Sequence, residues 1–340
     1  MTRKINNSYL PGQSNAPTTG GDMLKTRTDG TLVWEEVEGT DYRIDWYGSR
    51  GVFGGGQTNG AGGQSWNIID YITIASTGNA TDFGDLLAAV TGTASCSNGT
   101  RGLWAGGTIS GGEQNVIQYI TIASVGNTTD FGDLTLARNS QLAGIGGTRG
   151  IFAGGQSDSL SAVNDTIDYV TIDTTGNAID FGNLSSGNSG LAGCNDVTRG
   201  VFAAGYNGSA YVNTIEYITL ATTGNATDFG DRTVDKDGVS GCSDTTRGLF
   251  MGGGNPDNTI DYITIQTTGN ATDFGDLTQA RKLTSACSDG TKGVCAGGLS
   301  GGAGTYQNII DYVTIQTTGN ATDFGDLSQS RFYFSGTAGD

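Results

Sequence analysis

The chain has 340 residues, of which 59 are Gly and only 3 are Pro, and charged residues make up 15% of it. This composition excludes collagen and highly charged disordered polymers, and it favours short strands joined by Gly-rich turns. Lys and Arg total 17 against 34 Asp and Glu, which gives a net charge of −17. Because a chain with this negative charge repels phosphate backbones and anionic lipid surfaces, we expect no nucleic-acid partner and no membrane insertion.

The first predicted region is an extended N-terminal segment, residues 1–45. It is rich in Asn, Ser, Thr and Gly and contains Pro11 and Pro17. Such a composition favours a segment that orders on binding a partner. It has no apolar run of the kind found in export signals, so we expect synthesis in a cytoplasm.

Residues 46–340 are predicted to form one repeat domain. Six copies of a motif close to IDYITIATTGNATDFGDL occur, each preceded by a block such as TRGIFAGG, and the period is 45 to 51 residues. Repetition at such a period indicates a repeat architecture. The Phe of each copy is Phe83, Phe131, Phe181, Phe229, Phe274 or Phe324. The cation that opens each block is Arg50, Arg101, Arg149, Arg199, Arg247 or Lys292.

Each repeat is predicted to contain four short antiparallel strands. The first follows FGDL and passes through a repeated Cys, as in residues 283–287. The second is the RGIFAGG block, the third is the alternating IDYITI run, and the fourth is DFGDL. Four antiparallel strands per repeat are typical of a β-propeller blade, and a β-solenoid is the alternative.

The predicted propeller is all-β and six-bladed, and the C-terminal strand closes it. After the last DFGDL the chain continues through residues 331–336, which we expect to form a further first strand. That strand would complete the blade that begins near Arg50 and would hide two sheet edges at once. Residues 41–47 are the alternative source of this strand.

The repeat resembles the Kelch motif. Its double glycine, as in Gly106 and Gly107, is followed by a Tyr such as Tyr119 and by a trailing Arg such as Arg138. It differs from the Kelch motif in having Phe where that motif has Trp, and Ala204 interrupts one glycine pair. The resemblance spans residues 50–336 and implies a Kelch-like propeller, but it implies no particular function.

Two further stretches resemble bacteriophage proteins. GDMLKTRTDGTLVWEEV, from Gly21, resembles linker modules of tail-fibre and appendage proteins, and the repeats resemble virion proteins of marine tailed phages. The resemblance implies a structural virion protein of the tail or an appendage, made in the host cytoplasm and oligomeric in the particle. Residues 1–45 would bind other virion proteins, and the propeller would face a host glycan or protein, or serve as decoration. The alternative is a bacterial Kelch-like scaffold that binds a cellular protein.

The residue types present offer little for catalysis. The chain has no His, which removes the commonest general base and zinc ligand. Cys96, Cys194, Cys242 and Cys287 occupy one equivalent position per repeat, so we interpret them as buried packing residues. Cys295 has no partner that the sequence identifies. We therefore expect no enzyme activity, no catalytic residue, no cofactor and no metal ligand.

Repeated acids and cations are given structural interpretations. Asp82 and Asp85 recur in most repeats with the same neighbours, whereas a catalytic site needs one asymmetric arrangement. Bound Ca²⁺ stays open for these pairs, and a sialidase or glycosidase is the enzymatic alternative. The repeated cation, as in Arg101, is predicted to form a salt bridge between strands or blades. Asn79, in a repeated GNAT turn, is predicted to be a turn residue rather than a glycan site.

The loops between second and third strands vary most among the repeats. Their lengths are 12, 9, 11, 9, 6 and 11 residues, and they carry Trp66, Tyr206, Tyr211 and Tyr306 among Gly, Ser and Asn. Aromatic side chains on polar loops suit carbohydrate or protein recognition. These four residues are therefore the candidate binding residues, and loops without a ligand are the alternative.

Overall fold

The computed structural model describes residues 22–26, 32–36, 47–58, 64–140, 142–158, 162–301 and 305–340. The chain divides into two units, Met1–Arg43 and Ile44–Asp340. In the first unit, β1 (Asp22–Thr26) pairs antiparallel with β2 (Leu32–Glu36). The rest of the segment predicted to be extended lies outside the described residues.

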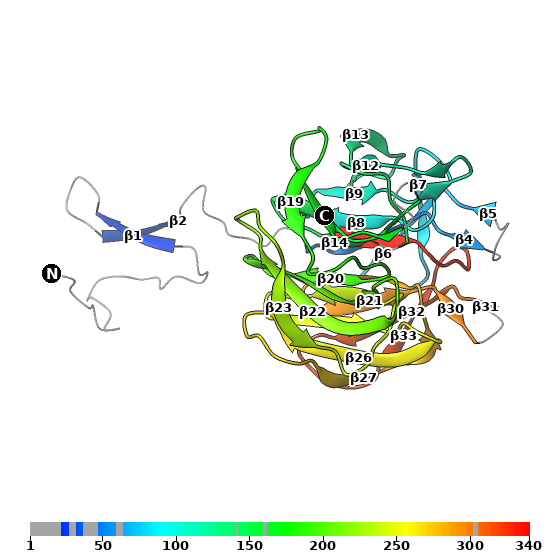
Figure 1. Cartoon of the computed structure of the whole chain (residues 1–340). Coiled ribbons are helices and arrows are strands. Elements are labelled where there is room, and N and C mark those ends of the chain that lie inside the picture. The colour runs from blue at the N-terminus through cyan, green and yellow to red at the C-terminus, as the bar shows by residue number, and fades with distance from the viewer. Residues whose placement is uncertain are drawn as a thin grey trace. The chain divides into compact units, whose positions relative to one another are not determined.

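The second unit contains six four-stranded antiparallel sheets that follow one another around it (Figure 1). Among the described residues there is no helix. The structure therefore confirms the predicted all-β, six-bladed propeller. The first blade contains β34 (Ser335–Gly339), β3 (Arg50–Gly54), β6 (Ile68–Thr73) and β7 (Thr81–Asp85). The second contains β8 (Ala94–Ser97), β9 (Arg101–Ala105), β12 (Val116–Thr121) and β13 (Thr129–Asp133).

The other four blades repeat this order of strands. The third contains β14 (Ala143–Ile145), β15 (Arg149–Ala153), β18 (Thr166–Thr171) and β19 (Ile179–Asn183). The fourth contains β20 (Ala192–Asn195), β21 (Arg199–Tyr206), β22 (Tyr211–Thr219) and β23 (Thr227–Asp231). The fifth contains β24 (Ser240–Ser243), β25 (Arg247–Met251), β26 (Asp257–Thr264) and β27 (Thr272–Arg281). The sixth contains β28 (Ser285–Ser288), β29 (Lys292–Ala296), β32 (Ile309–Thr314) and β33 (Thr322–Asp326).

The C-terminal strand closes the propeller, as predicted, by pairing with β3 in the first blade. Val52 is opposite Thr337, and Asp340 accepts hydrogen bonds from the main-chain N–H and the hydroxyl of Ser49. The predicted bounds of the first strands were wrong: β34 starts at Ser335 rather than at residue 331, and β28 starts at Ser285 rather than at residue 283. The reason is a left-handed residue shortly before each strand, Tyr333 and Leu283, which interrupts extended backbone.

The apolar core lies between neighbouring blades. In β15 every position after the opening cation is buried. In β18 Ile167, Asp168 and Val170 are buried, and Tyr169 is partly exposed. In each blade a Tyr of the third strand packs edge-on against the Phe of the fourth, as Tyr169 does against Phe181 at 5.8 Å. The repeated Tyr and Phe are therefore a packing pair.

The cation that opens each second strand ties its blade to the next. The guanidinium of Arg101 lies 4.8 Å from the ring centroid of Tyr119 and donates hydrogen bonds to the main-chain oxygens of Ile172 and Asp173. All six blades place this cation over the Tyr, at 4.3–5.1 Å. The predicted salt bridge is wrong: among the described residues these cations contact an aromatic ring and carbonyl oxygens. Both contacts leave a cation satisfied without a carboxylate.

The turn between the third and fourth strands covers the outer edge of the preceding blade. The N–H groups of Gly176 and Ala178 donate to the carbonyls of Phe131 and Asp133, and the side chain of Asn177 accepts the N–H of Asp133 at 3.1 Å. An uncovered edge strand is a template for pairing with another chain. The repeated Asn residues are thus turn residues that cap an edge, as predicted for Asn79. The Asn residues in this position are Asn79, Asn127, Asn177, Asn225, Asn270 and Asn320.

The six first strands contact one another around the propeller axis. Their approach requires small side chains, because a Cβ atom on Gly144 would lie 2.0 Å from the carbonyl oxygen of Ser95. Side chains also bond neighbouring strands: Ser97 Oγ donates to the Ala338 carbonyl at 2.6 Å, and Ser243 Oγ donates to the Asn195 carbonyl at 2.7 Å. The centre of the propeller is therefore closely packed.

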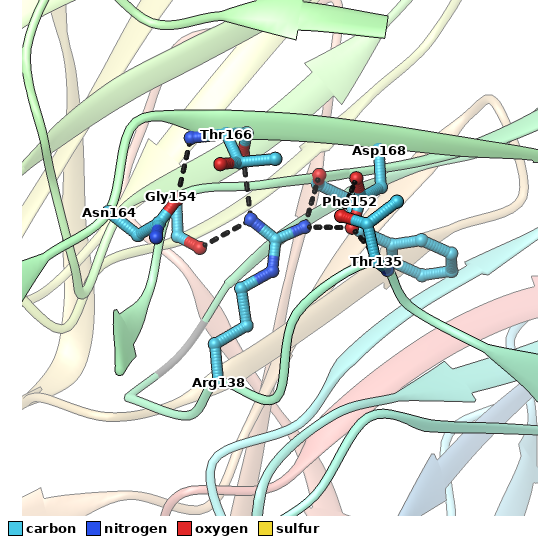
Figure 2. A network of polar contacts seen from close by, with 7 residues as sticks. All are labelled: Thr135, Arg138, Phe152, Gly154, Asn164, Thr166 and Asp168. Carbon is cyan, nitrogen blue, oxygen red and sulfur yellow. Dashed lines mark hydrogen bonds and ion pairs between the residues drawn. The ribbon is translucent and has the colours of Figure 1, made fainter. Parts of the chain in front are cut away.

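A buried ion pair fixes the entry of the chain into most blades. In the third blade Arg138, which precedes β14, donates to the main-chain oxygens of Phe152, Gly154 and Thr166 and to Asp168, whose carboxylate lies 2.8 Å away (Figure 2). Both side chains of this pair are fully buried. The trailing Arg of the repeat therefore holds the connection between blades against the third strand of the blade it enters.

Candidate functional site

The variable loops and the connections between blades share one face of the propeller, here called the connector face. Asn139 in a connection bridges to Gln156 in a loop, and Ser189 bridges to Tyr206 in the same way. Two-residue strands extend four of the loops above the blades. These strands are β4 (Gln57–Thr58), β5 (Gln64–Ser65), β10 (Thr108–Ile109), β11 (Gly112–Glu113), β16 (Gln156–Ser157), β17 (Ala162–Val163), β30 (Leu299–Ser300) and β31 (Thr305–Tyr306).

A circle of left-handed residues lies on this face, one per blade, and here it is called the left-handed circle. In the described part of the chain, main-chain hydrogen bonds join five of the six neighbouring pairs; for example, the N–H of Gly92 donates to the Tyr333 carbonyl at 2.7 Å, and that of Leu283 donates to the Gly238 carbonyl at 2.8 Å. The hydrogen bonds give the connector face a fixed main-chain framework. The members are Gly92, Ser140, Gly190, Gly238, Leu283 and Tyr333, with φ between 55° and 73°.

Three members of the circle are not glycine. L-residues in this conformation carry strain, and such residues gather where the surrounding structure or a function requires them. Leu283 is buried, whereas Ser140 and Tyr333 are partly exposed. The circle therefore presents polar side chains at two of its positions.

Tyr206 and Tyr211 face each other at the tip of the fourth blade. Strands β21 and β22 continue into this hairpin, where the two residues are paired and their rings meet edge-on at 5.7 Å. Tyr206 donates its hydroxyl to the Gly208 carbonyl at 2.9 Å. Tyr211 keeps 47% of its surface exposed. Among the described residues of the propeller it is the one aromatic side chain that counts as exposed. An exposed ring on an ordered hairpin is suited to stacking against a ligand.

Tyr333 belongs to the same part of the face. Burial raises the pKa of its phenol, and the Asp237 carboxylate and Tyr211 raise that pKa further. The main chain links the same region, because Ser189 pairs with Tyr206 and the next residue, Gly190, accepts the N–H of Gly238, which follows Asp237. The structure thus brings the fourth-blade tyrosines to a residue of the left-handed circle.

Among the described residues, the other two predicted binding residues make no ring contact with Tyr206 or Tyr211. Tyr306 stacks on Phe332, with ring centroids 5.4 Å apart, and is partly buried. Trp66 is also partly buried, and among the described residues its indole N–H has no acceptor. Trp66 makes no ring contact with the tyrosines in the described part of the chain. Phe332 in turn contacts Tyr333, with ring centroids 5.3 Å apart, so Tyr306 is linked through these two rings to the neighbourhood of Tyr211, whereas among the described residues Trp66 is not.

Two lysines of this face are not used in the contacts between blades. Elsewhere in residues 47–340 each Arg or Lys lies in a buried ion pair or over a tyrosine ring. Lys236 and Lys282 are partly exposed, and both lie near Asp237. Burial raises the pKa of Asp237 despite these two cations. The neighbourhood of Tyr211 and Tyr333 thus combines aromatic rings with a carboxylate and amines.

The repeated acid pairs do not form a comparable site. Asp82 is exposed and Asp85 is partly exposed on the outer strand, and the pairs recur in equivalent places around the propeller. In the described part of the chain no three His, Cys, Asp or Glu side chains come together as a metal site.

The propeller axis offers little room for a ligand. Two cavities of about 70 Å³ each are lined by the first strands of all six blades, and Tyr47 lines one of them. Ligand pockets usually measure about 300–1,000 Å³, whereas these cavities hold a few water molecules. The five cysteines nearby are free and buried. Among the described residues no helix is long and apolar enough to span a bilayer.

Sequence reasoning missed Tyr333, Asp237, Lys236 and Lys282. Residues 331–336 were assigned to a strand, which hid the left-handed position of Tyr333. A signal was present, because aligning the repeats places Tyr333 with Gly92, and three of the six aligned residues are Gly. A bulky residue at a position that favours Gly indicates a special role.

The fold defines the class: the chain is a β-propeller protein with six four-stranded blades. Its most distinctive exposed group is an aromatic hairpin on the connector face. No protein-family model and no curated protein sequence matches the chain.

Proposed function

We propose that this protein is a structural virion protein of a tailed bacteriophage, with a Kelch-like propeller displayed on the tail or an appendage. In this role the segment 1–45 binds other virion proteins, and the propeller, present in several copies, recognises the host surface without catalysis. The resemblance of the repeats and of the stretch after Gly21 to phage proteins supports the assignment to a virion. The absence of His from the sequence favours binding over turnover.

The observation that carries recognition is the exposed Tyr211 on its ordered hairpin. Tyr211 packs on Tyr206 and lies near Tyr333, so the aromatic surface is held in place before a ligand arrives. A preorganised surface loses little conformational entropy on binding. Asp237 and the two nearby lysines add hydrogen-bonding groups, which saccharide hydroxyls require. A host-surface glycan is therefore the proposed ligand class.

The alternative is a bacterial scaffold protein that binds a cellular partner through the same face. The variable loop lengths suit either role. The virion assignment is preferred because the sequence resemblance covers both the N-terminal region and the repeats.

The assignment to a virion is tested by immunogold labelling of purified phage particles with antibody against the full chain. Gold on the tail or its appendages is expected. Unlabelled particles, together with a cellular protein recovered stoichiometrically on the purified chain, would favour the scaffold instead.

Recognition is tested by competition, in which purified chain is added to host cells before the phage. We expect the chain to lower the adsorption rate and Tyr211→Ala to lose at least about tenfold in competing potency, the scale of one stacking contact. Leu87→Ala, at another exposed apolar residue, is the matched control and should compete like the unaltered chain. Equal potency of the Tyr211 variant and the control would exclude the hairpin as the binding surface.

A further inference from the structure

The residues of the buried ion pair of the third blade have aligned counterparts in every blade, and among the described residues two blades lack the ion pair. Four blades pair an Arg with the Asp of the third strand, and all eight side chains are fully buried. The second blade has Val90 and Gln118 in the two positions, and the fourth has Asn188 and Glu216. Three of the paired blades use Arg331 with Asp70, Arg138 with Asp168 and Arg281 with Asp311. The fifth blade has Lys236 in the position of Arg138 and pairs Asp261 with Arg232, four residues earlier.

The second blade replaces the pair by two neutral side chains. Gln118 is buried, and its side-chain oxygen accepts hydrogen bonds from the Thr128 hydroxyl at 2.7 Å and from the Leu87 N–H at 2.7 Å. Val90 contributes only apolar surface. Removing the cation and the carboxylate together leaves no buried charge to compensate.

The fourth blade loses the cation but keeps a carboxylate. Glu216 has 7% of its surface exposed and accepts the N–H of Ser185 at 3.0 Å. Among the described residues it forms no ion pair. A buried carboxylate without a positive charge nearby is strongly unfavourable, whereas the same group beside a cation is stable.

Oxygen atoms surround the position that the guanidinium takes in the third blade. There Arg138 binds the carbonyls of Phe152, Gly154 and Thr166. The equivalent residues of the fourth blade are Phe202, Ala204 and Thr214, and the side-chain amide of Asn188 donates to the Ala204 carbonyl at 2.7 Å. The side-chain oxygen of Asn188 is buried and, in the described part of the chain, accepts no hydrogen bond. Asn188 itself is only 8% exposed.

We propose that the Glu216–Asn188 position of the fourth blade binds a hard metal cation, Na⁺ or Ca²⁺, in place of the guanidinium. The ligands are the Glu216 carboxylate, the Asn188 side-chain oxygen, main-chain carbonyls of the same blade and water. Carboxylate, amide and carbonyl oxygens are the ligands that such cations prefer. The overall charge of −17 also raises the local concentration of cations.

The site lies at the base of the hairpin that carries Tyr211. Asn188 is followed by Ser189, whose main chain pairs with Tyr206, and Ala204 lies on the strand that leads into the hairpin. A bound cation therefore holds the connection and both hairpin strands together. This inference concerns the protein itself and stands whether or not the protein belongs to a virion.

The test is thermal unfolding of the full chain in tetramethylammonium chloride, with CaCl₂ or NaCl exchanged in at constant ionic strength. Calorimetric titration with CaCl₂ gives the affinity. For the unaltered chain we expect the melting temperature to rise by about 2 °C at ten times the dissociation constant. A rise with CaCl₂ alone identifies a divalent site, and a rise with both salts identifies a site for either ion.

The matched control is the double variant Asn188→Arg with Glu216→Asp, which installs the pair of the third blade. It should melt at a higher temperature than the unaltered chain without metal and should show no rise from the exchanged cation. The second control, Asn188→Val with Glu216→Gln, installs the neutral pair of the second blade. Its melting temperature should likewise exceed that of the unaltered chain without metal and should not rise with the exchanged cation. It also serves if the first variant fails to fold.

An unaltered chain that responds to neither salt would overturn the proposal. So would an equal rise in the unaltered chain and in a folded control, because the ions would then bind the acidic surface elsewhere.

Discussion

The guanidinium of Arg138 reaches three carbonyl oxygens and one carboxylate inside the third blade. Burial lowers the pKa of this guanidinium, and the neighbouring Asp168 opposes that effect. The group is costly to bury, so its value lies in fixing the connection rather than in net attraction. The second blade provides an internal comparison, because it has Val90 and Gln118 in the two positions of the ion pair.

Removing one partner of this pair should cost more than removing both. We expect Arg138→Val to lower the free energy of unfolding by about 3–5 kcal/mol, because Asp168 is left buried and unpaired. Adding Asp168→Gln to Arg138→Val should recover most of that loss, as in the second blade. Urea unfolding followed by circular dichroism measures both, and a double variant no more stable than the single would contradict the expectation.

Particular residues also show which features of the site could not be predicted from the sequence. The trailing Arg was recognised as part of the repeat, but its partner was not, although Gln118 and Glu216 replace Asp in the two blades where the equivalent of Arg138 is Val90 or Asn188. The left-handed circle was missed because its geometry arises from contacts between blades, and its non-Gly members give no local turn signal. Tyr211 was recognised from its loop, whereas its neighbours Asp237 and Tyr333 come from the connections that enter the fifth and the first blade.

At the scale of elements, the alternation of third strands and the repeated turns predicted nearly every strand of the blades. The first strands were the exception, since their starts depend on the left-handed residue that precedes them. The pairing of strands follows the predicted order in all six blades, because each repeat buries its apolar residues only against its neighbours. Repetition therefore made the architecture readable from one sequence.

The burial of the thiols in the first strands predicts how they react with alkylating reagents. Burial raises the pKa of Cys96, Cys194 and Cys287 far above that of a free thiol. Because the raised pKa lowers the thiolate fraction, the folded chain should resist iodoacetamide from pH 7 to 9, where an exposed thiol becomes steadily more reactive. Mass spectrometry should find no alkylation of the folded chain and five adducts after denaturation in guanidinium. Rapid labelling of Cys96 at pH 8 would contradict the buried position.

For the whole molecule, closure by the last strand should decide cooperative stability. Deleting residues 335–340 removes β34 and exposes one edge of β3 and the neighbouring first strands. We expect the truncated chain to lose its cooperative unfolding transition and to become sensitive to protease. Circular dichroism and limited proteolysis measure this, and a synthetic peptide with the sequence of residues 329–340 should restore part of the protection. A truncated chain as stable as the full one would show that closure contributes little.

The way the chain enters the propeller has a mechanical consequence. The N-terminal side leads directly into β3, which is hydrogen-bonded to β34 on one side and to β6 on the other. Tension between the N-terminus and the connector face runs along β3 and therefore loads both strand pairs in shear, so that many hydrogen bonds must break together. An entry through an edge strand would load only one strand pair in this way. A propeller tethered by its N-terminus is thus built to hold its shape while it is pulled.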